Sequence, residues 1–259
     1  RFAASGWRVN LTDLDPVKLS RARRLIHSEL ATLKKVGELT ASPDSIMDRI
    51  RTDEDNDQSL GTANLVIEAI VENVEAKKKL FHELASGVGT KTIVASNTSY
   101  LNTFPLVPEA LQNRFLIAHF FSPPHIVPLV EVVGGPTTEP EVVSRMVAWL
   151  KNMKMTPVVL RKFAPGFIVN RLQRAMGREI LHMIDEGYAD PHEIDLAVKS
   201  SLALRMPVVG VVKRYDFAGI DMTFRALQAP SIDLISEDSV SPSIKKLVEK
   251  GHLGVKTGR

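Results

Sequence analysis

The chain has 259 residues, of which 44% are hydrophobic and 24% are charged, a balance typical of a folded globular protein and not of disordered, collagen-like or coiled-coil chains. It contains no cysteine, which excludes disulfide scaffolds, thiol nucleophiles and thiolate zinc sites, and we expect no metal centre. The net charge of +3 is spread over helical stretches and no apolar run is long enough to span a membrane, so we expect neither a nucleic-acid nor a membrane partner. The lack of cysteine is compatible with a reducing compartment, and we expect a cytoplasmic location.

Short apolar runs alternate with amphipathic stretches in the first part of the chain. Strands are predicted at Val9–Thr12, Leu65–Ile70, Thr92–Ala95, Phe115–Ala118, Val127–Val133 and Pro157–Leu160. Helices are predicted between them; one starts at Asp15-Pro16 and another at a capping box, Thr138–Glu141. Such alternation predicts an α/β domain over residues 1–162, with a doubly wound, mostly parallel sheet covered on both faces.

The pattern becomes helical after this domain. A long helix is predicted from Pro165 to Ile184, a second after Asp190, and a third over Tyr215–Leu227. The only ambiguous strand candidate is Val208–Val212. Residues 163–259 are therefore expected to form an all-α domain.

Asp13 directly follows the first predicted strand. At the carboxyl end of the second strand of a βαβ unit, an acidic residue hydrogen-bonds the ribose of a bound adenosine, although acids also end strands without binding anything. The Gly-rich turn of such a site should lie about 20 residues upstream. We therefore expect a first strand and a Gly-rich loop before residue 1, in a polypeptide that continues beyond both ends of this sequence.

His119 and Glu131 are the strongest candidates for acid–base chemistry. His119 lies at the carboxyl end of a predicted strand, where open α/β sheets bind ligands, and Glu131 lies within the apolar strand Val127–Val133. A carboxylate in such a strand needs a partner, because burying it alone is costly. An imidazole is a suitable partner, since the carboxylate would fix its tautomer and stabilise its protonated form. The alternative is a structural histidine and a glutamate that faces solvent.

Two further polar positions are candidate ligand contacts. Ser96–Ser99 follows a predicted strand, where short polar side chains form turns or bind ligands. Asn170 lies in the first turn of the long helix, where it is either a local hydrogen-bonding group or a residue that faces a cleft between the domains.

Together these segments resemble the L-3-hydroxyacyl-CoA dehydrogenase family. The resemblance rests on Val66–Asn73, Ser96–Ser99, His119–Pro123, Leu129–Val133 and Pro165–Arg171, with Leu253–Gly258 similar to the family's C-terminal motif. It covers essentially the whole chain and implies a Rossmann-type domain followed by a helical domain that forms a homodimer interface.

The resemblance also implies roles for individual residues. His119 resembles the catalytic base, Glu131 its orienting carboxylate, and Ser99 and Asn170 the side chains that bind the substrate's oxygens. The residues that resemble the NAD-binding set are Asp13, Ala69, Glu72, Lys77 and Asn97. The implied reaction is oxidation of an L-3-hydroxyacyl-CoA to the 3-oxoacyl-CoA by hydride transfer to NAD, as in β-oxidation of fatty acids.

Some positions depart from the acyl-CoA pattern. Ser122 replaces the usual asparagine of the His119–Pro123 segment, and Tyr100 follows Ser99 where many acyl-CoA enzymes have a second serine. Parts of Pro123–Glu131 and Asn170–Gln173 are similar to the relatives that act on free hydroxy acids, the L-gulonate and carnitine dehydrogenases. A free 3-hydroxy acid is therefore the alternative substrate, and a non-catalytic homologue is the remaining alternative.

Overall fold

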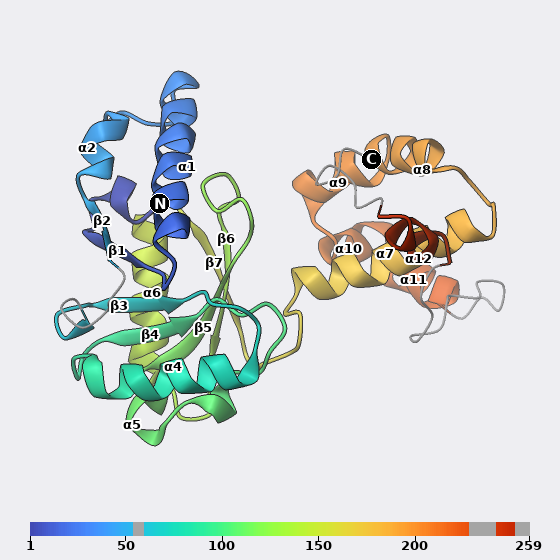
Figure 1. Cartoon of the computed structure of the whole chain (residues 1–259). Coiled ribbons are helices and arrows are strands. Elements are labelled where there is room, and N and C mark those ends of the chain that lie inside the picture. Colours follow the sequence, from blue (N-terminus) through green and yellow to red (C-terminus); the bar gives the residue numbers. More distant parts are fainter. Residues whose placement is uncertain (54–59, 228–241, 252–259) are drawn as a thin grey trace. The chain divides into compact units, whose positions relative to one another are not determined.

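The computed structural model describes residues 1–53, 60–227 and 242–251, and the chain divides into two compact units, Arg1–Ile168 and Val169–Arg259 (Figure 1). The division falls shortly after the boundary expected from the sequence, between residues 162 and 163. Each unit is described separately below. In the described part of the chain, no helix is both long and apolar enough to cross a membrane.

The centre of the first unit is a five-stranded sheet in the order β3-β4-β5-β6-β7. Its strands are β3 (Leu65–Glu68), β4 (Ile93–Ser96), β5 (Phe115–Phe120), β6 (Leu129–Gly134) and β7 (Thr156–Leu160). All neighbouring pairs are parallel except β5 and β6, which are antiparallel. Two further parallel strands, β1 (Val9–Thr12) and β2 (Ile50–Asp53), form a separate sheet. The mostly parallel sheet predicted from the alternating pattern is confirmed.

Helices cover both faces of the larger sheet, α4 on one side and α6 on the other (Figure 1). The helical elements of this unit are η1 (Ala3–Ser5), α1 (Pro16–Lys35), α2 (Pro43–Met47), α4 (Val74–Gly87), η2 (Phe104–Leu106), α5 (Glu109–Gln112) and α6 (Pro140–Asn152). Asp15 caps α1 as predicted, because its side chain accepts from the N–H groups of Val17 and Lys18. Asn73 caps α4 in the same way.

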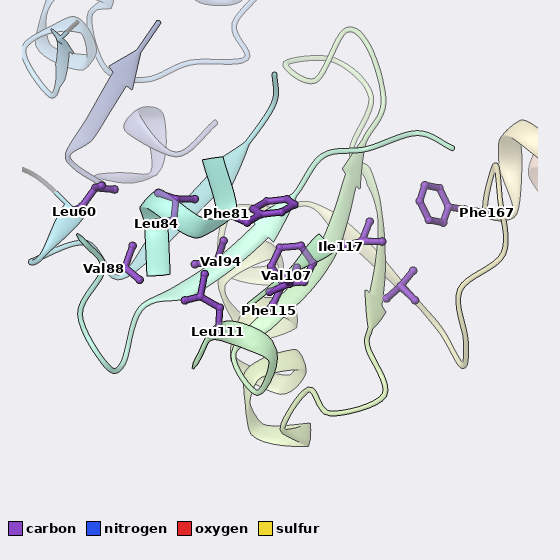
Figure 2. Packing of buried hydrophobic residues seen from close by; sticks show 11 residues of the cluster. Leu60, Phe81, Leu84, Val88, Val94, Val107, Leu111, Phe115, Ile117 and Phe167 are labelled. Carbon is purple, nitrogen blue, oxygen red and sulfur yellow. The ribbon is translucent and has the colours of Figure 1, made fainter. Parts of the chain in front are cut away.

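Alternation along the strands divides the core into two layers. Val94, Phe115 and Ile117 point to the α4 side, where they pack with Phe81 and Leu84 (Figure 2). The intervening strand residues point to the α6 side, where they pack with helix residues; this cluster includes Ile93, Ala95, Leu116, Ala118, Val142, Met146 and Leu150. Because both faces are buried, β4 and β5 read as continuous apolar runs rather than as alternating ones.

The second unit is helical throughout its described residues, as predicted. Its helices are α7 (Val169–Asp185), α8 (Pro191–Lys199), α9 (Leu202–Val209), α10 (Lys213–Ala218), α11 (Ile220–Leu227) and α12 (Pro242–Glu249). Asp190 and Glu193 form a complete capping box at the start of α8. The ambiguous segment Val208–Val212 is the end of α9 and the turn after it, not a strand.

Three local predictions are wrong. Thr138–Glu141 is not a capping box, because α6 begins at Pro140 after Glu139 and the hydroxyl of Thr138 binds Gly135 and Phe115 instead. The helix expected over Tyr215–Leu227 is interrupted at Gly219, whose φ is +93°.

The long helix begins at Val169 rather than near Pro165. Gly166 and Phe167 both adopt left-handed backbone conformations, with φ of 76° and 50°, and a right-handed helix cannot pass through them. For a residue with a Cβ this conformation is unfavourable. The left-handed conformation of Phe167 is maintained because its side chain is 1% exposed and packs in the cluster on the α4 face. Figure 2 labels Phe167 in this cluster.

Candidate active site

His119 and Glu131 are direct partners across two antiparallel strands. The register of β5 and β6 places His119 opposite Glu131, so both side chains leave the same face of the sheet. His119 Nδ1 lies 3.0 Å from Glu131 Oε2, and the residues are 4% and 0% exposed. The structure therefore brings together the pair that the sequence suggested.

The second oxygen of Glu131 is bound to the backbone. Glu131 Oε1 accepts a hydrogen bond of 2.9 Å from the N–H of Ile168, directly after the left-handed residue Phe167. Each carboxylate oxygen therefore has a donor, and the carboxylate is held in one orientation. A carboxylate fixed in this way favours the histidine tautomer with its proton on Nδ1, which leaves the Nε2 lone pair available as a base.

Aromatic rings surround the imidazole. The ring centroid of Phe167 lies 5.0 Å from that of His119, and the centroid of Phe121 lies 4.7 Å away. The imidazole is therefore held between these two rings and the Glu131 carboxylate.

A polar loop follows β4, the neighbouring strand of β5. Residues 97–101 are called here the Ser99 loop. Asn97 Oδ1 accepts a hydrogen bond of 2.8 Å from the N–H of Phe120, and the Asn97 N–H donates to the Glu68 carbonyl over 2.8 Å. The register pairs Ser96 with Ile117, so the loop leaves the same edge of the sheet as His119. Asn97 therefore joins the Ser99 loop to the strand end that carries the histidine.

A buried ion pair lies beneath this edge. Lys77 Nζ is 2.6 Å from Glu68 Oε1, and the two side chains are 1% and 0% exposed. Glu68 also accepts hydrogen bonds from the Ser96 hydroxyl at 2.6 Å and from the Ile70 N–H at 2.8 Å. Buried charges of this kind need both an opposite charge and further hydrogen bonds, and Glu68 has both.

Glu72 connects Lys77 to the Ser99 loop. Its Oε2 lies 3.2 Å from Lys77 Nζ, and its Oε1 accepts from the Thr98 hydroxyl at 2.7 Å, the Ser99 N–H at 2.8 Å and the Tyr100 N–H at 3.3 Å. Burial by itself raises the pKa of Glu72, but the hydrogen bonds from Thr98, Ser99, Tyr100 and Lys77 outweigh it and hold the pKa below its ordinary value.

The other predicted site residues are Asp13, Ala69 and Asn170. Asp13 follows β1 in the two-stranded sheet, where its Oδ1 accepts from the Asp15 N–H at 3.0 Å and lies 3.9 Å from Lys18 Nζ. Ala69 is exposed directly after β3. Asn170 lies in the first turn of α7, in the second unit. The predicted C-terminal motif Leu253–Gly258 lies outside the described residues.

Sequence reasoning missed Glu68, Thr98 and the backbone donor Ile168. Glu68 carries the same signal as Glu131, a glutamate in an apolar strand, and the same burial argument would have found it. Thr98 was part of a polar turn but had no separate signal. The Ile168 N–H depends on two left-handed residues that no local pattern indicates.

Some of these groups fit a nucleotide cofactor and none forms a metal cluster. Asp13 is a carboxylate at the carboxyl end of a parallel strand, with a side chain that is 41% exposed, and such a group fits the hydroxyls of a ribose. Within residues 1–53, 60–227 and 242–251, no group of three or more His, Asp or Glu side chains is arranged to hold a metal ion.

Comparison with known families covers both units. Residues 1–163 match the model of the 3-hydroxyacyl-CoA dehydrogenase NAD binding domain, and residues 166–259 match that of the 3-hydroxyacyl-CoA dehydrogenase C-terminal domain.

Individual relatives have several different names. The chain is 29% identical over 259 residues to the 5-formyl-3-hydroxy-2-methylpyridine 4-carboxylate 5-dehydrogenase of Mesorhizobium japonicum, covering 100% of this chain and 83% of the relative. It is 33% identical over 259 residues to the "Probable 3-hydroxybutyryl-CoA dehydrogenase" of Deinococcus radiodurans, covering 99% and 91%. It is 30% identical over 255 residues to the L-carnitine dehydrogenase of Streptomyces griseus, covering 92% and 75%.

Solved structures of similar fold cover nearly the whole chain. The crystal structure of a 5-formyl-3-hydroxy-2-methylpyridine 4-carboxylic acid 5-dehydrogenase, described as an NAD+-dependent dismutase, has a TM-score of 0.88 and 28% identity, covering 100% of this chain and 83% of its own. An (S)-3-hydroxybutyryl-CoA dehydrogenase from Ralstonia eutropha has a TM-score of 0.77 and 29% identity, covering 99% and 90%.

Proposed function

The chain belongs to the 3-hydroxyacyl-CoA dehydrogenase family, NAD-dependent oxidoreductases that act on CH–OH groups, and we propose that it oxidises an L-3-hydroxyacyl-CoA to the 3-oxoacyl-CoA. The observation that carries this proposal is the buried contact of 3.0 Å between His119 Nδ1 and Glu131 Oε2 at the carboxyl end of β5. Ligands of open α/β sheets bind at this edge.

His119 is the general base of the proposed reaction. With its Nδ1 proton donated to Glu131, its Nε2 accepts the proton of the substrate's 3-hydroxyl group. Glu131 stabilises the imidazolium that results and keeps the ring in place through its second bond, to Ile168. In the reductive direction, the same imidazolium returns the proton to the 3-oxo oxygen.

NAD+, when bound, supplies the acceptor for the hydride that leaves C3. In this proposal Asp13 binds the adenosine ribose, and Ala69, Glu72, Lys77 and Asn97 line the cofactor site at the carboxyl ends of β3 and β4. Asp13 would repel the 2′-phosphate of NADP, so NAD is preferred. Two features support these assignments: the exposure of Asp13 and the position of Ala69 and Asn97 directly after their strands.

Ser99 and Asn170 bind the substrate's oxygen atoms in the proposal. Ser99 is supported by its place in a loop that Asn97 joins to the strand end of His119. Asn170 is supported by the family resemblance of Pro165–Arg171. Holding the hydroxyl group in one orientation accelerates the reaction, because the proton and the hydride must leave along defined directions.

A free 3-hydroxy acid is the second candidate substrate. The relatives include an L-carnitine dehydrogenase at 30% identity, and Ser122 departs from the acyl-CoA pattern. Values of kcat/KM for the oxidation of L-3-hydroxybutyryl-CoA, L-gulonate and L-carnitine with NAD+ separate the two candidates. A clear preference for either free acid would overturn the CoA assignment but leave the redox chemistry in place. No turnover on any of these substrates would instead favour a non-catalytic homologue.

We expect His119→Gln to lower kcat by about 10²- to 10⁴-fold, the usual contribution of general-base catalysis. Turnover is followed by NADH absorbance, and the affinity for NAD, measured separately by calorimetry, should not change. His82→Gln is the matched control, since His82 is an exposed histidine on α4. Equal kcat values for the two variants would exclude His119 as the base.

A homodimer is part of the proposal. The second unit carries large exposed apolar side chains on several helices, among them Leu172 and Met176 on α7 and Leu204 and Val208 on α9. Spacing of four residues places each pair on one face of its helix. Apolar faces of this kind are usually covered in a protein's functional state.

A further inference from the structure

The Glu72 carboxylate has a more specific task than lining a cofactor site. We propose that Glu72 is a positioning residue that fixes the Ser99 loop, and that the buried Glu68–Lys77 pair holds Glu72 in place for this purpose. The inference rests on the proposed function, because Ser99 is there a substrate-binding residue.

The contacts of Glu72 Oε1 converge on the Ser99 loop. This one oxygen accepts the Thr98 hydroxyl and the backbone N–H groups of Ser99 and Tyr100. Three donors on one carboxylate oxygen define the path of the backbone through three consecutive residues. Because the acceptor is charged, each bond is stronger than a bond to a neutral group.

The other carboxylate oxygen of Glu72, Oε2, is held by the buried Lys77 ammonium group. Lys77 Nζ binds Glu72 Oε2 at 3.2 Å and Glu68 Oε1 at 2.6 Å, and Glu68 is in turn bound by the Ser96 hydroxyl at 2.6 Å. Lys77 is 1% exposed, so its ammonium group has few alternative positions. A chain of contacts thus runs from the buried end of β4 through Glu68, Lys77 and Glu72 to the Ser99 loop, and this chain is called here the relay.

The geometry explains why a charged residue is needed at position 72. An amide in place of the carboxylate presents one acceptor and one donor group. If its oxygen faces the loop N–H groups, its NH₂ faces the Lys77 ammonium; if it turns over, its NH₂ faces the loop donors. Glutamine therefore cannot satisfy both partners at once, although it has almost the same shape.

Hydrogen exchange measures the position of the loop without reference to activity. In Glu72→Gln, amide exchange of the peptide that contains Ser99 and Tyr100 is expected to become at least about tenfold faster, because hydrogen bonds to a charged acceptor are lost. Glu75→Gln is the matched control, since Glu75 is an exposed glutamate in the first turn of the same helix, α4. Equal exchange in both variants and in the wild type would overturn the inference.

A second pair of variants tests the same relay with an isosteric change. Thr98→Val removes the hydroxyl that donates to Glu72 and that also accepts from the Leu101 N–H at 3.0 Å within the loop. Thr92→Val removes a comparably buried hydroxyl at the other end of β4, which donates to Ala63 at 2.6 Å. Only Thr98→Val is expected to increase exchange at Ser99 and Tyr100. If Glu72→Gln fails to fold, as judged by its circular dichroism, Glu72→Asp decides the question, because it shortens the side chain that reaches the loop and leaves the bonds between Thr98 and Leu101 in place.

Kinetics then separate positioning from cofactor binding. In Glu72→Gln, KM for the hydroxyacyl substrate should rise and kcat should fall, and kcat/KM should change by a larger factor than the dissociation constant for NAD measured without substrate. A weaker NAD complex with unchanged loop exchange would assign Glu72 to the cofactor alone. A wild-type protein without dehydrogenase activity would refute the proposed function, yet the exchange data would still test the relay.

Discussion

The two carboxylate oxygens of Glu131 have different partners. One oxygen orients the His119 ring and the other anchors a backbone N–H, and the side chain is fully buried. A group in this position is retained in the fold only when its donors are present, because an unpaired buried carboxylate is costly.

Glu131→Gln is expected to reduce kcat strongly, by about 10²-fold or more, while the protein remains folded. The amide oxygen can still accept from Ile168, but the NH₂ group then faces His119 Nδ1 and forces the ring proton onto Nε2. His119 Nε2 then has no free lone pair to accept the substrate's proton, although glutamine has almost the same shape as glutamate. Steady-state rates measure the loss of kcat, and the circular dichroism spectrum shows whether the variant is folded.

Glu141→Gln is the control for this substitution, since Glu141 lies exposed in the first turn of α6. Full activity of the Glu131 variant would contradict the orienting role. A Glu131 variant that binds NAD poorly would also contradict it, because in the proposal Glu131 assists the proton transfer to His119 and does not bind the cofactor.

Glu72 should make stability depend on pH in acid. Its hydrogen bonds lower its pKa in the folded state, so its stabilising contribution is complete above the ordinary glutamate pKa of about 4.3. That contribution is lost as the pH falls through the lower folded-state value. The difference in unfolding free energy between wild type and Glu72→Gln, measured by urea unfolding, should therefore be largest above about pH 5 and shrink as the pH is lowered below it. A difference that grows in acid would show the opposite sign of the shift.

At the scale of the secondary-structure elements, Thr138 connects the β6–α6 turn to the start of β5. Its hydroxyl accepts from the Gly135 N–H at 2.7 Å and donates to the Phe115 carbonyl at 2.5 Å. Thr138→Val should destabilise the protein by about 1–3 kcal/mol, since two backbone groups lose their partner. Thr137→Val, at the exposed neighbouring position, should stay within about 0.5 kcal/mol. Equal urea midpoints would rule out this role for Thr138.

Element prediction succeeded where a pattern is local and failed where tertiary contacts decide. The apolar runs of β4 and β5 are buried on both faces and can be recognised from the sequence. The four-residue strand β2, in which Ile50 is the only hydrophobic residue, was missed. The Thr138 capping box was wrong because its hydroxyl has better-placed partners on β5 and in the turn, which lie apart from the helix start.

For the site residues too, positions with a local sequence signal could be predicted and positions fixed by tertiary contacts could not. Glu131 was predictable because a carboxylate in an apolar strand must have a partner, and His119, at the carboxyl end of a predicted strand, was a suitable one. The burial of Lys77 was not predictable, since it depends on Glu68, nine positions away on another element. The roles of Ser99 and Asn170 came from resemblance and stay predictions.

At the scale of the whole molecule, we expect a homodimer held by the second unit. Sedimentation should give about twice the chain mass of 28.6 kDa for the wild type. Leu172→Glu should shift it to the monomer, because the charge would be buried without a partner. Leu25→Glu, at an equally exposed leucine on α1, should leave the mass unchanged. A monomeric wild type, or equal masses for both variants, would refute the interface.

The hydrogen bond from the Ile168 N–H links the Glu131 carboxylate to the end of the first unit. Ile168 is the last residue of the first unit, and α7 begins at the next residue. The same carboxylate therefore anchors both the His119 ring and the last backbone N–H of the first unit, and a change at either contact reaches the other through one side chain.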